Sequence, residues 1–140
     1  MPRLNGRYLK VGDWLLDNTT GVLQHEDTVE QLDQALVDLL NFLARSPNEV
    51  LTGDVILESV WPDAEVGDDV LDVAIAQLLR HFKDDEKDPK YIKVLPQVGY
   101  TLVAQVQFID ETIDQNQQTA QRLFFVSISL LLFGVLFSVV

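Results

Sequence analysis

Apolar residues recur at three- and four-residue intervals over residues 28–45, which is the pattern of an amphipathic helix. Thr28 and Gln31 have the spacing of a capping box, so the pattern predicts that this helix begins at residue 28, and Ser46-Pro47 predicts its end. The apolar positions are Val29, Leu32, Leu36, Leu39, Leu40 and Leu43, and the polar positions predicted to face solvent are Glu30, Gln31, Asp33, Gln34, Asp38 and Asn41.

Two further helices are predicted over residues 53–61 and 69–83, the first capped by Thr52 and stopped by Pro62, the second with Asp68 as its N-cap. At 100° per residue, four apolar residues of the third helix fall within about 60° of one another, so we expect them to face the core. These residues are Leu71, Ile75, Leu78 and Phe82. The opposite, outward face then consists of Asp69, Val73, Ala76 and Arg80, flanked by Gln77, Lys83 and Asp84.

Short β-prone stretches flank the three helices. Residues 8–11, 14–16 and 22–24 are separated by turn sequences and predict a small antiparallel sheet. Residues 91–95 and 100–106 predict a hairpin around the turn Pro96-Gln97-Val98-Gly99. The order of strands, three helices and hairpin predicts an α+β winged helix-turn-helix domain over residues 1–106, with the hairpin as its wing.

The chain after this domain changes character twice. Residues 107–121 are polar and rich in Gln and Asp, and predict a tether. Residues 123–140, from Leu123 to Val140, hold 14 large apolar residues and no charge, and as a helix they would measure about 27 Å. We expect residues 122–140 to form a single transmembrane helix, with Arg122 reaching the headgroups. A buried core helix is the less favoured alternative, because the segment is apolar on every face. A tail anchor and a piece of a longer protein both fit a span at this position.

Charge and composition narrow the classes of function. The chain has 10 basic and 22 acidic residues, a net charge of -12, whereas DNA-binding proteins usually present a basic surface. It contains no cysteine, and its two histidines, His25 and His81, lack metal-ligand spacing. The pairs Asp68-Asp69 and Asp84-Asp85 are explained by helix capping and loop solvation rather than by catalysis. We therefore expect no enzymatic activity, no metal and no cofactor.

Several stretches in the same order resemble one family of regulators. They are Gly12–Asp17, Leu36–Ala44, Asn48–Thr52, Leu57–Trp61, Asp88–Ile92 and Gly99–Leu102. They resemble the OmpR/PhoB-type winged-helix domain, and the following apolar segment makes the chain similar to the ToxR/CadC-like membrane-anchored regulators. The resemblance implies a cytoplasmic domain that binds double-stranded DNA, with the third helix in the major groove, the wing on the backbone and the anchor in the bacterial inner membrane.

The chain departs from this family's pattern where DNA would be read. The third helix presents carboxylates and small apolar residues instead of mostly polar or basic ones, and acidic residues 84–86 and 88 interleave with the nearby cations. The residues available for DNA are Val73, Ala76, Gln77, Arg80, Lys83, Lys90 and Lys93. The alternative is a winged helix that binds a protein partner, or a second copy, instead of DNA, through Asp68, Asp69, Asp72, Val73 and Ala76. The residues alone favour the protein partner, and the resemblance favours DNA.

Overall fold

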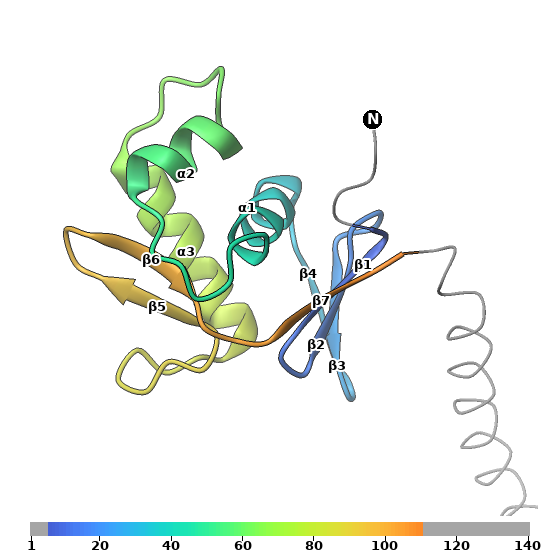
Figure 1. The fold of residues 1–140 in the computed structure, drawn as a ribbon. Coiled ribbons are helices and arrows are strands. Elements are labelled where there is room, and N and C mark those ends of the chain that lie inside the picture. Colours follow the sequence, from blue (N-terminus) through green and yellow to red (C-terminus); the bar gives the residue numbers. More distant parts are fainter. Residues whose placement is uncertain (1–5, 111–140) are drawn as a thin grey trace, which may run out of the picture.

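The computed structural model describes residues 6–110, which form the domain shown in Figure 1. The predicted transmembrane helix and residues 111–121 of the predicted tether lie outside the described residues. Within residues 6–110, no helix has both the length and the apolar character needed to cross a bilayer.

An antiparallel sheet of five strands forms one side of the domain, in the order β4-β3-β2-β1-β7. Its strands are β1 (Tyr8–Val11), β2 (Trp14–Asp17), β3 (Val22–His25), β4 (Thr28–Gln31) and β7 (Val106–Ile109). The first three confirm the predicted strands. Alternate residues of β1 and β2 are buried, including Leu9, Val11 and Leu16 at 0 % exposure, so one face of the sheet lies on the core.

The predicted helix over residues 28–45 is wrong in its first turn and a half, because residues 28–31 form strand β4. A left-handed Glu26 turns the chain back, and Gln24 then pairs with Val29 across an antiparallel ladder. Helix α1 (Gln34–Ala44) begins only after its N-cap Asp33, whose side chain accepts a hydrogen bond from the Leu36 N–H at 3.0 Å. Thr28 and Gln31 are therefore not a capping box, and Val29 is 59 % exposed instead of buried.

One predicted solvent-facing residue of α1 is also buried. Asn41 is 4 % exposed, and its amide nitrogen donates to Asn18 Oδ1 at 2.7 Å and to the Val37 carbonyl at 2.8 Å. Asn18 lies in the turn between β2 and β3 and donates in turn to the Gly6 carbonyl. Asn41 thus ties α1 to the sheet, a contact that the spacing of apolar residues could not reveal.

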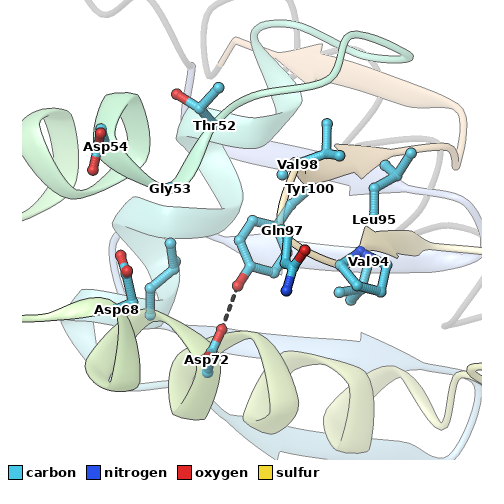
Figure 2. Close-up of a pocket in the computed structure, with 13 residues that line it drawn as sticks. Thr52, Gly53, Asp54, Asp68, Asp72, Val94, Leu95, Gln97, Val98 and Tyr100 are labelled. Atoms are coloured by element: carbon cyan, nitrogen blue, oxygen red, sulfur yellow. Dashed lines mark hydrogen bonds between the residues drawn. The ribbon is translucent and has the colours of Figure 1, made fainter.

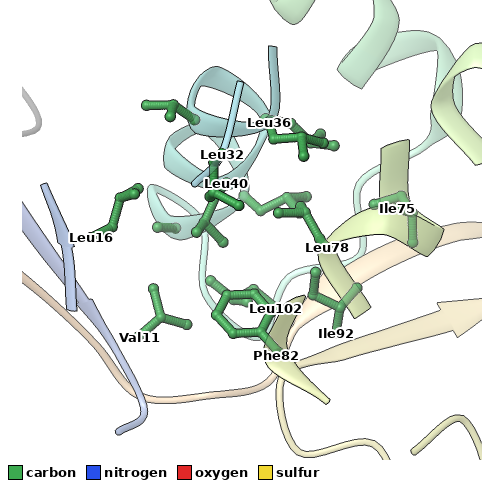
Figure 3. Packing of buried hydrophobic residues seen from close by; sticks show 14 of the residues in the cluster. Val11, Leu16, Leu32, Leu36, Leu40, Ile75, Leu78, Phe82, Ile92 and Leu102 are labelled. Atoms are coloured by element: carbon green, nitrogen blue, oxygen red, sulfur yellow. The ribbon is translucent and has the colours of Figure 1, made fainter. Parts of the chain in front are cut away.

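Helices α2 (Gly53–Val60) and α3 (Asp68–Phe82) complete the helical layer. Thr52 caps α2 as predicted, by accepting from the Val55 N–H. The predicted N-cap of α3 is wrong: Gly67 is the N-cap without any side-chain bond, and Asp68 is already helical. The predicted core face of α3 is confirmed, because Leu71, Ile75, Leu78 and Phe82 are all at most 3 % exposed. Figure 3 shows the last three of these packed between α1, the sheet and the base of the wing.

The wing is the hairpin of β5 (Ile92–Leu95) and β6 (Gly99–Leu102), and the segment before α2 pairs with it through Leu51 and Tyr100. The predicted return strand over residues 100–106 is too long, because the chain leaves the wing after Leu102 and forms β7 in the other sheet. Strand β7 pairs with β1 and includes residues 107–109, which the polar composition had assigned to the tether. The side chains of Val106 and Phe108 pack against the core and account for this pairing.

Candidate nucleic-acid interface

Helix α3 lies between the other two helices and the wing (Figure 1), and the residues along one of its sides are exposed. Four residues of the predicted outward face are exposed: Asp69, Val73, Ala76 and Arg80. Gln77 is half-buried and faces a hollow shared with α1, and the neighbouring Lys83 is exposed. The structure therefore brings together, along one helix, the α3 residues that the sequence offered for DNA.

The exposed side of α3 has opposite charges at its two ends. Asp68, Asp69 and Asp72 lie in its first turn and a half, whereas Arg80 and the C-cap residue Lys83 lie at its end. This distribution suits the helix dipole, which favours negative charge at the N-terminus and positive charge at the C-terminus. It also divides the surface into an acidic half that repels phosphate and a basic half that attracts it. Val73, 57 % exposed, and Ala76 lie between the two halves.

Asp84 has a structural role that sequence reasoning missed. Its Oδ1 accepts hydrogen bonds from the backbone N–H groups of Asp85 and Lys90, and its Oδ2 accepts from those of Tyr91 and Ile92, at 2.8 to 3.1 Å. The carboxylate thus closes the loop that joins α3 to the wing. In the sequence, Asp84 is one of the acids that interleave with the cations, and in the structure its carboxylate is turned toward the loop backbone.

We expect Asp84→Ala to lower the free energy of unfolding by roughly 2 kcal/mol, because several charge-assisted hydrogen bonds are lost while the loop must still close. Urea denaturation followed by circular dichroism measures the change. Asp85→Ala is the matched control, since Asp85 lies in the same loop and its carboxylate accepts a hydrogen bond from the Lys87 N–H at 3.0 Å. Equal destabilisation by the two substitutions would contradict this role for Asp84.

An open groove of about 560 Å³ separates the first half of α3 from the wing (Figure 2). Asp54, Asp68 and Asp72 line it from the helices, and Gln97, Val98 and Tyr100 are among the residues that line it from the wing. The Tyr100 hydroxyl donates a hydrogen bond across the groove to Asp72 Oδ1. Burial, followed by the bond to Asp72, raises the pKa of Tyr100 to about 12, so the hydroxyl is protonated and remains a donor at neutral pH. Sequence reasoning did not single out Tyr100 as a site residue.

Aromatic contacts hold the end of α3 against the base of the wing. The Phe82 ring stacks on Tyr91 with a centroid separation of 4.7 Å, and it forms a T-shaped pair with Trp14 at a centroid separation of 6.1 Å. The end of α3, where Arg80 and Lys83 lie, is therefore held against the core by the Phe82 ring.

The two histidines of the described domain contact different residues. His25 packs against Trp14, and His81 Nδ1 lies 3.8 Å from Glu30 Oε2. In residues 6–110 no group of three or more His, Cys, Asp or Glu side chains could hold a metal ion.

Three helices, the sheet before them and the hairpin after them define a winged helix-turn-helix domain. Residues 27–102 match the family described as "Transcriptional regulatory protein, C terminal". The chain belongs to this family, which is of the OmpR/PhoB type and comprises DNA-binding transcriptional regulators rather than enzymes.

Proteins that are similar to this chain in sequence include transcriptional activators. The chain is 32 % identical over 104 residues to the transcriptional activator CadC of Escherichia coli, a match covering 74 % of this chain and 20 % of CadC. It is also 32 % identical over 107 residues to the cholera toxin transcriptional activator of Vibrio cholerae, covering 75 % of this chain and 36 % of that protein. The chain thus matches only between a fifth and about a third of the length of these relatives.

Solved structures share the fold. The DNA-binding domain of Escherichia coli CadC superposes with a TM-score of 0.67 at 30 % identity, covering 75 % of this chain and 99 % of that domain. The Klebsiella pneumoniae RstA DNA-binding domain, solved in complex with the RstA box, superposes with a TM-score of 0.59 at 22 % identity. That match covers 69 % of this chain and 97 % of the RstA DNA-binding domain, and it shows the fold alone.

Proposed function

We propose that this chain is a membrane-anchored transcriptional regulator that binds double-stranded DNA through the second half of α3 and the wing. The membership in a family of DNA-binding regulators supports DNA as the partner, and the similarity to the DNA-binding domain of CadC at 30 % identity supports it further. The domain acts in the cytoplasm, where the DNA is.

The basic end of α3 is the observation that carries the proposal. Arg80 and Lys83 are exposed there, and Lys90 and Lys93 follow on the loop and on β5. The Asp84 carboxylate keeps its charge beside Arg80 and Lys83, but its hydrogen bonds go to four backbone N–H groups of the loop. Arg80 and Gln77 supply donors for base edges in the major groove, Val73 and Ala76 fit a thymine methyl, and the three lysines contact phosphates.

We expect Arg80→Ala to weaken DNA binding about tenfold at low salt and to reduce the salt dependence, because one charged contact is removed. Fluorescence anisotropy with a labelled duplex and the full chain in a mild non-ionic detergent measures the affinity. Lys10→Ala is the matched control, since Lys10 is exposed on β1, in the sheet on the other side of the domain from the wing (Figure 1). Equal losses for the two variants would show that binding does not use α3.

The anchor in this proposal is the apolar segment of residues 123–140. Support comes from its length and lack of charge, and from the place where the described chain ends. Strand β7 is an edge strand of the five-stranded sheet, and the wing extends from the opposite side of the domain (Figure 1). A membrane reached through the end of β7 would therefore leave α3 and the wing accessible to DNA.

The acidic half of α3 favours a second candidate function, in which the domain binds a basic protein partner instead of DNA. Asp68, Asp69 and Asp72 are exposed beside Val73, a combination of charge and apolar area that suits a protein contact. Two results together would favour it: no DNA binding by the folded chain at low salt, and loss of the regulator's effect on the transcriptome with Asp69→Lys but not with Arg80→Ala.

A further inference from the structure

We propose that Asp72 restrains DNA binding from within the domain, by holding the Tyr100 hydroxyl and by placing a negative charge in the groove between α3 and the wing. A DNA phosphate that contacts the wing at the Tyr100 hydroxyl must first displace Asp72 from it. This inference rests on the proposed DNA-binding function and adds to it a residue that sets its strength.

The geometry of the wing aims the Tyr100 hydroxyl at α3. Leu51 holds both backbone polar groups of Tyr100, because the Tyr100 N–H donates to the Leu51 carbonyl at 2.9 Å and the Tyr100 carbonyl accepts from the Leu51 N–H at 2.8 Å. The ring is therefore held above the groove, and its hydroxyl reaches the Asp72 carboxylate on the facing turn of α3 (Figure 2). A hydroxyl donor in this position can bind an anion, and here it donates its hydrogen bond to the carboxylate of Asp72.

The groove is acidic beyond this one contact. Asp54 at the start of α2 and Asp68 at the start of α3 also line it, and no Lys or Arg of the described residues does. Asp68 is close enough to Tyr100 to contribute to the raised pKa of its hydroxyl. A phosphate that approaches the wing here meets repulsion from carboxylates and finds the tyrosine donor already occupied.

The contact therefore has two separable effects on DNA. The charge of Asp72 repels the backbone, as any carboxylate on this face would. The hydrogen bond from Tyr100 to Asp72, in addition, withholds the hydroxyl donor from a DNA phosphate. Asp69 provides the comparison, because it is exposed on the same half of α3 and lies outside the residues that line the groove.

A double-mutant cycle on the full chain in non-ionic detergent tests the proposal, with a fluorescein-labelled mixed-sequence duplex at low salt. Asp72→Ala should tighten binding about tenfold, and Asp69→Ala only about threefold, since removal of one surface carboxylate changes repulsion alone. Tyr100→Phe should change the affinity less than about twofold when Asp72 is present. In the Asp72→Ala background, the same change should weaken binding about fivefold, because the freed hydroxyl then contacts phosphate.

The outcomes separate the inference from the function on which it rests. Equal effects of Tyr100→Phe in both backgrounds, or equal gains from Asp72→Ala and Asp69→Ala, would overturn the restraint while leaving DNA binding in place. Absence of binding by every variant, with circular dichroism unchanged, would overturn the DNA-binding function and the restraint together. Asp72→Asn guards against a folding defect, because it keeps an acceptor oxygen for Tyr100 and should give a gain smaller than that of Asp72→Ala.

Discussion

Gly99→Ala is expected to destabilise the domain by about 3 kcal/mol, near the upper end of the usual cost of overpacking. A Cβ at residue 99 would lie 2.3 Å from the Leu51 carbonyl oxygen, 2.9 Å from its carbon and 3.2 Å from Thr52 Cα. These are backbone atoms that cannot rotate away. Relief would require the wing to separate from the segment before α2, at the expense of the paired hydrogen bonds between Leu51 and Tyr100.

Urea denaturation followed by circular dichroism measures this effect, and Gly53→Ala provides its control. A Cβ at residue 53 would meet its nearest atoms, Asp68 Oδ1 and Leu71 Cδ2, at 3.5 and 3.6 Å, which is ordinary contact distance. Since Gly53 is the first residue of α2, alanine there should be neutral or slightly stabilising. A loss of stability with Gly53→Ala as large as that with Gly99→Ala would contradict the steric explanation.

Loss of the apolar segment is expected to release the protein from the membrane almost completely. Removal of residues 123–140 deletes the run of apolar residues on which anchoring would depend. Leu131→Arg combined with Leu132→Arg should act in the same direction, because each arginine near the centre of a span costs about 3 kcal/mol in insertion. Fractionation after alkaline carbonate extraction measures the distribution.

The conservative double change of Leu131 and Leu132 to Ile is the control for this experiment and should leave the protein in the membrane fraction. Unchanged membrane association of the arginine variant would indicate attachment by other means. Wild-type protein in the soluble fraction would remove the anchor from the proposed function and leave the DNA-binding domain unaffected.

The periodic spacing of apolar residues predicted those helices and strands in which the apolar residues face the core at the expected interval. The helical spacing of Leu71, Ile75, Leu78 and Phe82 correctly gave the buried face of α3. The same kind of pattern gave the wrong element over residues 28–31. The half-buried positions of β4 there are the polar Thr28 and Glu30, so the strand does not show the usual alternation of apolar and polar residues. Strand β7 was missed because its pairing with β1 joins residues about a hundred positions apart, and pairing at that distance leaves no local signal.

The exposure of three α3 residues of the candidate site was predicted from the sequence, but the contacts around them were not. Rotation about the helix axis identified Val73, Ala76 and Arg80 as outward-facing, and they are exposed. The bonds of Asp84 to backbone groups up to eight residues later, and the contact between Tyr100 and Asp72, depend on how the loop and the wing return to α3. No spacing rule relates residues 72 and 100, so only the three-dimensional arrangement could show that a hydrogen bond between their side chains spans the groove.

The salt dependence of DNA binding by the full chain is the measurement that tests the central claim most directly. If Arg80, Lys83, Lys90 and Lys93 contact the DNA backbone or bases, the logarithm of the association constant should fall linearly with the logarithm of salt concentration, with a slope of roughly -3 to -4. Binding at low salt with that slope would support a DNA-binding regulator that uses the basic half of α3 and the wing. A folded chain that binds no DNA at low salt, or binds with no salt dependence, would contradict it.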